Sequence, residues 1–466
     1  MWSREEILLI TRGEMVREGR ERVFGAIVTD SKRAKRGSVF VALRGERLDG
    51  HAFLKDAASR GAACLIVEGW DPVTRLREAT VIKVRDTLKA LGDLAHYRRS
   101  VVAPKVLAIT GSNGKTTTKE MVAAILERAS VQGQPLRGRV LKTEGNYNNL
   151  VGLPLTLLRL QGKERVAVVE LGTSHPGEIA RLTQIAAPNI GLVTSVAPAH
   201  LAGFGNLAGV AREKGELYRG LNPGGIAVIN LDDPWVRRLG GRFKGEKITF
   251  GKGGDVRAES RRPLGASGTE FTLRVGGGRR RVRLKLCGEH NLANALGAAA
   301  MAYGLGAGLE AMQRGLESMK AFPMRMAVEK WRGVGIINDA YNANPASMKA
   351  ALETLRQIEA TGEKVAILGD MLELGRETRQ RHAELGKEAA RLDVDRLYLL
   401  GAQAARVKEG ALLAGMKEDQ VLVGRSPRDI ARRLGRHVRA GDWLLFKGSR
   451  GMKMETVLDA FKELRA

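Results

Sequence analysis

Cysteine is scarce in this 466-residue chain, where Cys64 and Cys287 each occur inside an apolar run. This pattern favours small buried side chains over a disulfide or a thiolate metal site. Long apolar runs are also missing, since none approaches the roughly 20 residues that span a bilayer. The start, MWSREEILLITRGEM, has acidic residues and no small-residue cleavage pattern. We therefore expect a cytoplasmic protein without membrane insertion.

Acidic residues are under-represented, because 77 Lys and Arg outnumber 51 Asp and Glu and give a formal net charge of +26. Such a field attracts polyanions, nucleotides or an anionic membrane. The basic residues are spread along the chain, however, and we find no RNA-binding signature or aromatic-studded basic groove. Arg279, Arg280 and Arg281 follow three glycines in an alternating stretch, which predicts a solvated hairpin. We expect no nucleic-acid partner.

The length predicts several domains, because one hydrophobic core rarely organises 466 residues. Residues 1–103 alternate strand-like runs, at 38–43 and 62–67, with a helical stretch at 52–60, which predicts a small α/β domain. Pro104 is the expected boundary.

Residues 104–321 have the texture of a parallel sheet. Continuous Val and Ile runs are separated by helical stretches, one of them from about 115 to 128, which is typical of a sheet covered on both faces. Ligands of such sheets lie at the carboxyl ends of the strands. Between about 247 and 286 the pattern changes to short alternating runs, which predict an antiparallel insert, and a helix follows near Asn291. The expected parallel strands are 105–110, 166–170, 190–195 and 226–230.

Residues 322–466 repeat the α/β texture, with strands expected at 335–338, 364–369, 396–401 and 442–447. This pattern predicts a C-terminal Rossmann-like domain, although no G-x-G-x-x-G motif follows a strand. The fold class is therefore α/β with three domains, 1–103, 104–321 and 322–466.

The stretch TGSNGKTTTKE, residues 110–120, lies between a strand and the 115–128 helix. In a phosphate-binding loop the backbone N–H groups wrap the phosphates, the lysine neutralises β and γ oxygens, and the next hydroxyl ligates magnesium. Lys115 and Thr116 supply these groups. The strict pattern has glycine where this chain has Ile109, but the change removes no functional group. A simple helix-capping turn does not explain the Lys-Thr pair, so we expect ATP binding.

Two further residues follow strand ends in the central segment. Glu170 ends the 166–170 strand, where a carboxylate can complete a magnesium site beside phosphates. A strand-end carboxylate in solvent is the competing interpretation. His200 follows another strand end in an Ala/Pro context, where a packed or surface histidine is the more common outcome.

Several motifs together resemble the Mur ligase family of ATP-dependent amide-forming enzymes. Their order and spacing match along nearly the whole chain: TGSNGKTTTKEM, EGNYNNL at 144–150, VELGT at 169–173, AHL at 199–201, REKGE at 212–216 and HNLAN at 290–294. The segments NDAYNANP at 338–345 and LGDMLELG at 368–375 are similar to members that add D-alanyl-D-alanine. TDSK at 29–32 and GERLDGH at 45–51 are similar to the family's uridine-nucleotide domain, although Lys32 often has arginine as its counterpart, which puts a forked nucleotide contact in doubt.

The resemblance implies ATP and two magnesium ions bound between the central and C-terminal domains. It places Thr116 and Glu170 on one ion and His200 on a second, and it matches Lys214 to a lysine that members carry as a carbamate. A carbamate would give this cation a carboxylate-like head, whereas an unmodified Lys214 is an ordinary helix cation. Lys115, Lys214, His200 and Arg325 are the implied catalytic residues.

For the nucleotide, the resemblance places Asn294 beside the adenine, Asp339 on the ribose and Arg325 at the γ-phosphate. Asn291 and Asn294 are one helical turn apart and can face the same ligand. The full expected set is Gly111, Ser112, Asn113, Gly114, Lys115, Thr116, Thr117, Asn291, Asn294, Arg325 and Asp339.

The expected substrates are a UDP-N-acetylmuramoyl-tripeptide and D-alanyl-D-alanine, joined through an acyl phosphate. Turn formation explains the loop that contains Asn146, Asn148 and Asn149 equally well. A solvent-facing position is a strong alternative for Lys447 and for Arg450. The candidate substrate residues are Ser31, Asp49, Asn146, Asn149, Thr173, Ser174, Asn342, Asn344 and Lys447.

Three other functions remain open. A sister ligase with a different amino acid is the nearest alternative, a basic P-loop ATPase acting on nucleic acid is a second, and a non-catalytic nucleotide-binding scaffold is a third. We expect the ligase, acting as a monomer.

Overall fold

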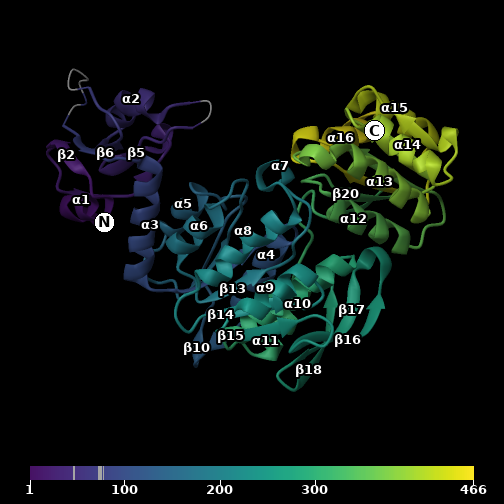
Figure 1. The fold of residues 1–466 in the computed structure, drawn as a ribbon, viewed down its shortest axis with the longest axis horizontal. Coiled ribbons are helices and arrows are strands. Elements are labelled where there is room, and N and C mark those ends of the chain that lie inside the picture. The colour runs from purple at the N-terminus through teal and green to yellow at the C-terminus, as the bar shows by residue number, and fades with distance from the viewer. Residues whose placement is uncertain (46–47, 72–75, 77, 466) are drawn as a thin grey trace.

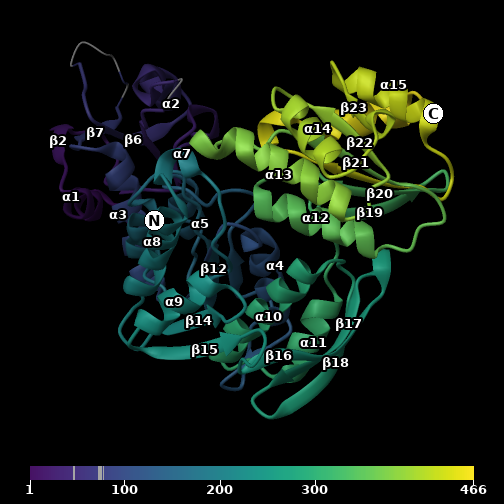
Figure 2. The ribbon, with the colours of Figure 1, turned by 45° about the vertical axis from the view of Figure 1, so that its right-hand side comes forward.

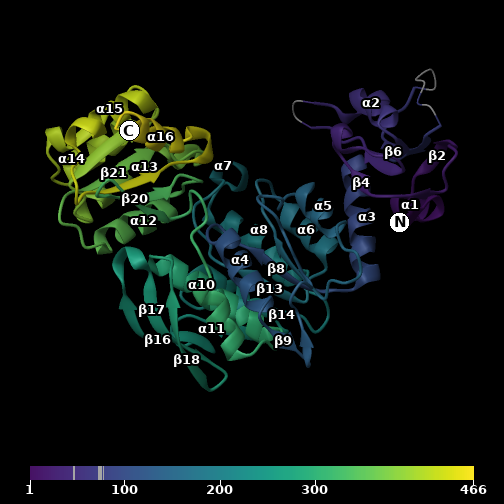
Figure 3. The ribbon, with the colours of Figure 1, turned by 180° about the vertical axis from the view of Figure 1, so that it is seen from behind.

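The computed structural model describes residues 1–45, 48–71, 76 and 78–465 of the chain. Three sheets of five, nine and six strands follow one another along the sequence. We call the regions around them the N-terminal, central and C-terminal lobes. Figure 1 shows the N-terminal lobe in purple and the C-terminal lobe in green to yellow at opposite ends, with the central lobe between them. Figure 3 shows the same arrangement from behind.

The N-terminal lobe is a mostly parallel sheet with helices packed around it. The run at 62–67 forms a strand with the expected bounds, whereas the run at 38–43 ends at Val41. The expected helix at 52–60 is a 3-10 turn, Gly50–Phe53, followed by a shorter α-helix. The elements are β2 (Glu14–Arg17), β4 (Ile27–Val28), β5 (Ser38–Val41), β6 (Ala62–Val67), β7 (Thr80–Lys83), α1 (Arg4–Thr11), α2 (Leu54–Ser59), α3 (Thr87–Val102) and the small pair β1 (Trp2–Ser3) and β3 (Val23–Phe24).

Helix α3 connects the N-terminal lobe to the central lobe, and Asp93 on it bridges the two. This carboxylate accepts hydrogen bonds from Lys89 Nζ at 2.7 Å and from Arg181 Nη2 on α6 (Glu178–Ala186), also at 2.7 Å. Burial raises the pKa of Asp93, but the hydrogen bonds from Lys89 and Arg181 outweigh it and hold the pKa below its ordinary value.

Asp93→Asn is expected to lower the free energy of unfolding by about 1 kcal/mol at neutral pH. Because the folded-state pKa is lowered, the stabilisation is complete above about pH 4 and is lost as the pH falls through the folded pKa. Denaturant unfolding should therefore show a wild-type-to-variant gap that narrows between pH 7 and pH 3. Glu310→Gln, which breaks an exposed pair with Arg314, should change stability less, and a pH-independent gap would contradict the assignment.

The central lobe is built on a nine-stranded sheet in the order β11-β12-β8-β13-β14-β15-β16-β17-β18. Strands β11 to β16 pair in parallel, and β16 to β18 pair antiparallel. The strands are β8 (Lys105–Thr110), β11 (Val140–Lys142), β12 (Val166–Glu170), β13 (Ile190–Val193), β14 (Ile226–Asn230), β15 (Glu246–Phe250), β16 (Val256–Pro263), β17 (Thr269–Val275) and β18 (Gly278–Leu284), with a separate pair β9 (Ser130–Val131) and β10 (Gln134–Pro135).

The antiparallel insert expected at about 247–286 is confirmed for β16 to β18. The prediction is wrong for its first residues, which form β15. Strand β15 joins the parallel sheet beside β14, and the antiparallel strands extend that same sheet. The glycines at 276 and 277 have φ values of 54° and 84° and make the tight turn between β17 and β18. Arg279, Arg280 and Arg281 are exposed on this hairpin, as expected.

Helices cover both faces of the central sheet because alternate residues of its middle strand point to opposite sides. Leu107 and Ile109 pack with α4, α10 and α11, whereas Val106 and Ala108 pack with α5, α6, α8 and α9. The helix expected at 115–128 ends at Leu126. The remaining helices are α4 (Lys115–Leu126), α5 (Gly152–Leu157), α7 (Leu201–Phe204), α8 (Leu207–Arg219), α9 (Pro234–Arg242), α10 (Glu289–Gly304) and α11 (Leu309–Glu317).

The C-terminal lobe has a six-stranded sheet in the order β19-β20-β24-β21-β22-β23, parallel except for β19. Hydrophobic clusters lie on both of its faces. All four expected strands are present within two residues of their bounds. The elements are β19 (Ala327–Trp331), β20 (Val334–Asp339), β21 (Lys364–Gly369), β22 (Arg396–Leu400), β23 (Val421–Val423), β24 (Trp443–Lys447), α12 (Pro345–Gln357), α13 (Thr378–Arg391), α14 (Ala404–Leu413), α15 (Pro427–His437) and α16 (Glu455–Glu463).

Both cysteines are free and buried, and burial raises the pKa of each thiol, that of Cys287 to about 11. The interpretation of Cys64 and Cys287 as small packed side chains is thus confirmed. Within the described part of the chain, no helix combines the length and apolar character that a bilayer crossing needs.

Candidate active site

A cavity of about 690 Å³ lies where the central and C-terminal lobes meet. The central lobe lines it from the ends of β8, β12, β13 and β14, and the C-terminal lobe from the ends of β20 and β24. Because these are the carboxyl ends of parallel strands, the location agrees with the position expected for ligands. Figure 2 shows α12 of the C-terminal lobe above α4 and α10 of the central lobe.

The glycine loop enters this cavity between β8 and α4. Gly111 and Gly114 have φ values of 145° and 82°, and a Cβ at these positions would overlap Thr194 and Asn294 respectively. Both positions therefore require glycine. Ile109, where the strict motif has glycine, is fully buried within β8. The replacement of glycine by Ile109 thus leaves the loop intact, with Gly111 and Gly114 as its glycines.

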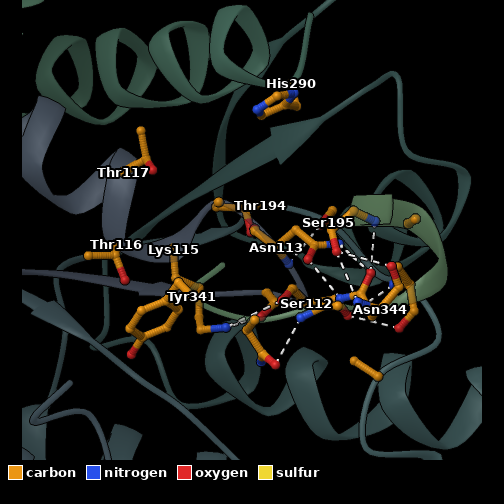
Figure 4. A pocket seen from close by; sticks show the side chains of 18 of the residues that line it. Ser112, Asn113, Lys115, Thr116, Thr117, Thr194, Ser195, His290, Tyr341 and Asn344 are labelled. Carbon is orange, nitrogen blue, oxygen red and sulfur yellow. Dashed lines mark hydrogen bonds between the residues drawn. The ribbon is translucent and has the colours of Figure 1, made fainter. Parts of the chain in front are cut away.

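The loop is held to the neighbouring strand end by several hydrogen bonds. Ser112 N donates to Ser195 O at 2.9 Å, and Ser112 Oγ donates to Ala197 O at 3.0 Å. Figure 4 shows Ser112, Asn113 and Lys115 beside Thr194 and Ser195 at the cavity wall. Backbone N–H groups of the loop and the N-terminus of α4 form a region suited to phosphate oxygens.

Lys115, Thr116 and Glu170 meet beside the loop. Lys115 Nζ donates to Gly111 O at 2.8 Å, and Thr116 Oγ1 donates to Glu170 Oε2 at 2.9 Å. Glu170 is 2% exposed, and its other oxygen accepts a hydrogen bond from Asn148 Nδ2 at 2.7 Å. The alternative of a solvated strand-end carboxylate is therefore wrong. Burial lowers the pKa of Lys115, and Glu170 partly opposes this shift.

Lys214 lies on α8 with its side chain facing the same cavity. It is 3% exposed, so the interpretation as a solvated helix cation is wrong. Burial lowers the pKa of Lys214 to about 7, with a further contribution from the Lys115 charge. The preceding Glu213 accepts hydrogen bonds from Gly177 N and Ile179 N, each at 2.8 Å, which fixes this turn of α8.

His200 precedes the short helix α7 and lines the same cavity as Lys214. Its Nδ1 contacts the carboxylate of Glu373, which comes from the C-terminal lobe. Burial lowers the pKa of His200, and Glu373 opposes that shift. His200 is therefore neither deep in a core nor on an open surface. Those were the two more common positions for a histidine in such an Ala/Pro context.

The donor set around the cavity fits magnesium bound together with phosphates. Among the described residues no group of three or more His, Cys, Asp or Glu is placed to hold a metal on its own. Magnesium usually takes one or two protein carboxylates and completes its shell with substrate phosphates and water. The buried Glu170 beside Thr116 supplies such a carboxylate next to the phosphate loop.

Asn291 and Asn294 project from α10 toward the loop, one turn apart as expected. Asn294 Nδ2 donates to Asn291 Oδ1 at 3.3 Å, and Thr118 Oγ1 donates to Asn294 Oδ1 at 3.3 Å. Both asparagines line the cavity, as does Thr117.

The C-terminal lobe contributes Arg325, which lies over the ring of Tyr341 at 3.8 Å from the centroid, and Asp339. Lys447 Nζ donates to Asp339 Oδ2 at 2.5 Å and to Asn342 O at 3.0 Å. Lys447 is 2% exposed, so its solvent-facing alternative is wrong, because the end of β24 buries it beside β20. That alternative holds for Arg450, which is exposed although it lines the cavity rim.

Asn344 joins the two lobes directly. It caps α12, and its side-chain amide exchanges hydrogen bonds with that of Asn113, at 2.7 and 3.3 Å. Asn344, which is one of the candidate substrate residues expected from the sequence, therefore lies beside the phosphate loop.

The candidate substrate residues fall into two groups. Asn146, Thr173, Ser174, Asn342, Asn344 and Lys447 line the cavity, whereas Ser31, Asp49 and Asn149 are not among its lining residues.

Residues outside the cavity have local roles. Asn149 Oδ1 accepts from Gly152 N at 2.8 Å and so supports the start of α5, as the turn alternative predicted. Ser31 and Asp49 belong to the N-terminal lobe, where Ser31 is buried and Asp49 caps a 3-10 turn. Glu46 and Arg47 of the GERLDGH motif lie outside the described residues.

Sequence reasoning missed several residues at the site. Glu373, Tyr341 and His290 were only parts of longer motifs, and Asn148 belonged to a loop without an assigned partner. Their partners are up to 173 positions away along the chain. An acidic residue shortly after a strand, as in LGDMLELG, was the one local signal for Glu373.

Comparison with known proteins identifies the class. The description "Mur ligase middle domain" matches residues 109–302, "Mur ligase, glutamate ligase domain" matches 324–450, and "Mur ligase family, catalytic domain" matches 24–99. These matches cover most of the chain, which belongs to the Mur ligase family and is an enzyme of the ligase class.

Relatives with high coverage carry a more specific name. The chain is 38% identical to the UDP-N-acetylmuramoyl-tripeptide–D-alanyl-D-alanine ligase of Escherichia coli, over 97% of each chain, and 35% identical to that of Bacillus subtilis, over 94% and 93%. Its fold is similar to MurF from Acinetobacter baumannii, with a TM-score of 0.90, 34% identity and 99% of each chain covered. It is also similar to MurF ligase from Thermotoga maritima in complex with ADP, with a TM-score of 0.83, 31% identity and 95% and 98% covered.

Proposed function

We propose that this protein joins D-alanyl-D-alanine to the terminal carboxylate of a UDP-N-acetylmuramoyl-tripeptide, with ATP converted to ADP and phosphate, in peptidoglycan precursor synthesis. One observation carries the proposal. Lys115, Glu170, Lys214 and Arg325, which come from two lobes, line one cavity. The similarity to ligases of this name over nearly the full length supports the choice of substrates.

Each domain has a separate part in this proposal. Residues 1–103 bind the uridine nucleotide, with Ser31 and Asp49 as contacts; residues 104–321 bind the ATP phosphates; residues 322–466 bind adenosine and the dipeptide. Asn291, Asn294 and Asp339 hold the adenosine. Thr173, Ser174 and Asn146 face the peptide substrate, whereas Asn342, Asn344 and Lys447 serve the incoming dipeptide. We propose a monomer that acts in the cytoplasm.

The first step activates a carboxylate, whose oxygen cannot leave as oxide. A terminal carboxylate oxygen of the tripeptide attacks the γ-phosphorus of ATP, the bond to the β-phosphate oxygen breaks, and ADP leaves. Negative charge grows on the transferred group, and Lys115 and Arg325 are the cationic side chains placed to stabilise it. Lys115 is half-buried, and this strengthens the interaction because water screens it less than at an open surface.

The second step forms the amide. The neutral amine of D-alanyl-D-alanine attacks the acyl phosphate carbon, the tetrahedral intermediate expels phosphate, and the amine proton passes to solvent water. We do not assign this proton to His200, because a metal-bound imidazole has its lone pair occupied.

Magnesium, when bound with ATP, supplies positive charge beside the β and γ oxygens. The residues that would hold one ion are Thr116 and Glu170, and those for a second are His200 and Lys214. A carbamate on Lys214 would turn this amine into an oxygen ligand. The lowered pKa of Lys214, about 7, supports the modification because CO₂ reacts only with the neutral amine.

A phosphate-release assay tests the proposal. We expect phosphate only when ATP, the UDP-linked tripeptide and D-alanyl-D-alanine are all present, because either substrate alone leaves the acyl phosphate unformed or unconsumed. Stimulation by DNA or RNA, sensitive to salt, with no response to the peptide pair would instead support the nucleic-acid ATPase. Nucleotide binding without turnover in any mixture would support the scaffold. Replacing D-alanyl-D-alanine with single amino acids in the same assay tests for a sister ligase.

A further inference from the structure

Glu373 extends from the C-terminal lobe to a residue of the central lobe. It lies in the loop between β21 and the 3-10 turn Gly375–Glu377. Its carboxylate contacts His200 Nδ1, and its backbone oxygen accepts a hydrogen bond from Ala202 N at 3.2 Å. Gly375 packs against the backbone of Ala202. Figures 1 and 3 show α7 at the boundary with the C-terminal lobe, where these contacts occur.

Both partners have an uncommon backbone conformation. His200 has a φ of 53° and Glu373 a φ of 64°, in the left-handed region that non-glycine residues seldom adopt. Such conformations cost on the order of 1 kcal/mol each and persist where surrounding contacts determine them, often at functional sites. Here the strain occurs on both sides of one contact between lobes.

The contact has a chemical consequence for the imidazole. When a carboxylate accepts the Nδ1 hydrogen, the tautomer and the ring orientation are fixed, and the lone pair of Nε2 is free for a cation. Lys115 and Lys214 line the same cavity from the central lobe. Glu373 is the carboxylate that reaches this ring from the other lobe.

We propose that Glu373 is a positioning residue that orients His200 as a metal ligand and so makes the second cation site depend on contact between the lobes. This inference rests on the proposed function, in which His200 holds a cation. Since the carboxylate is on the C-terminal lobe and the imidazole on the central lobe, separation of the lobes removes the orienting group. The cation site is then complete only in the closed arrangement.

The contribution of the Glu373–His200 contact to stability distinguishes a role in orienting the ring from a role in holding the lobes together. The Glu373 side chain is 59% exposed and that of His200 is 32% exposed, so water screens the pair and its contribution to stability is small. Orientation of the ring does not need a large energy, however. We therefore expect the loss of Glu373 to change cation affinity much more than it changes stability.

The experiment measures Mn²⁺ binding by electron paramagnetic resonance, in the full-length protein with a non-hydrolysable ATP analogue. Glu373→Ala is expected to weaken one class of Mn²⁺ site by about 10-fold to 100-fold. Glu373→Gln should fall between wild type and Glu373→Ala, because its amide oxygen still accepts the Nδ1 hydrogen but carries no charge. His200→Ala should lose the same site, and adding Glu373→Ala to it should cause no further loss.

Glu377→Gln is the matched control. Glu377 lies in the adjoining 3-10 turn but pairs with Arg381 of its own lobe, so Mn²⁺ affinity should stay at the wild-type value. Thermal unfolding of every variant should remain close to wild type. Unchanged Mn²⁺ affinity in both Glu373 variants would overturn the inference.

A second measurement distinguishes positioning from a latch. Fluorophores on Arg219→Cys in α8 and Arg379→Cys in α13, both exposed positions, report the distance between the lobes. If Glu373→Ala increases this distance but leaves the Mn²⁺ affinity unchanged, Glu373 only holds the two lobes together, and the inference is contradicted. Because neither readout requires amide formation, failure of the phosphate-release assay would reject the proposed function without deciding the role of Glu373.

Discussion

Lys115→Ala is expected to lower kcat/KM for ATP by on the order of 10³-fold, with the largest share in kcat. The Lys115 ammonium is half-buried beside the glycine loop, where water screens it less than on an open surface. Its attraction for the transferred phosphoryl group therefore grows as negative charge develops in the transition state. Steady-state phosphate release with all three substrates measures the change, and nucleotide binding measured by calorimetry separates affinity from rate.

Lys105→Ala provides the matched control. Lys105 is an exposed lysine at the other end of the same strand, β8, so its removal tests the loss of one positive charge without touching the cavity. Its activity should equal that of wild type. If Lys115→Ala kept more than about a tenth of wild-type kcat, the phosphate role of this lysine would be wrong.

Lys214→Ala is expected to lose activity by on the order of 100-fold or more, and short carboxylic acids such as formate or acetate should restore part of it. The side chain is buried, so its truncation leaves room in which a small carboxylate can replace the proposed carbamate. Phosphate release measured across a concentration series of each acid gives the rescue curve.

The control for rescue is Lys115→Ala, because a carboxylate cannot replace an ammonium that faces phosphates. This variant should not respond to the acids. Full activity of Lys214→Ala without any additive would remove Lys214 from the mechanism. Loss of activity without rescue, together with an unmodified lysine by mass spectrometry of the wild-type protein, would reject the carbamate.

Local features of the sequence predicted the central elements well. The strands 105–110, 166–170 and 226–230 have the expected bounds, because each is a short, mostly apolar run that contains several β-branched residues. The glycine loop was also predictable from residue type. Its conformation depends on backbone freedom at Gly111 and Gly114, which the residue type itself supplies.

Predictions failed where packing between distant segments decides the outcome. Strand β15 was grouped with the antiparallel strands, although its pairing with β14 makes it parallel. Lys447 had a solvent-facing alternative, yet the order of strands in the C-terminal sheet buries it beside Asp339. The alternation of apolar residues along a strand predicts neither the neighbour of that strand in the sheet nor the burial of a residue at its end.

The sequence by itself determined the fold class, the phosphate loop and, through the spacing of its motifs, the resemblance to the Mur ligases. Those features depend on residue type and on neighbours within a few positions. Only the tertiary structure decided which groups meet in the cavity. Examples are the Asn113–Asn344 pair and the contact between His200 and Glu373. The physical reason is that burial, pKa and hydrogen-bond partners depend on segments more than 150 positions apart that the three sheets bring together.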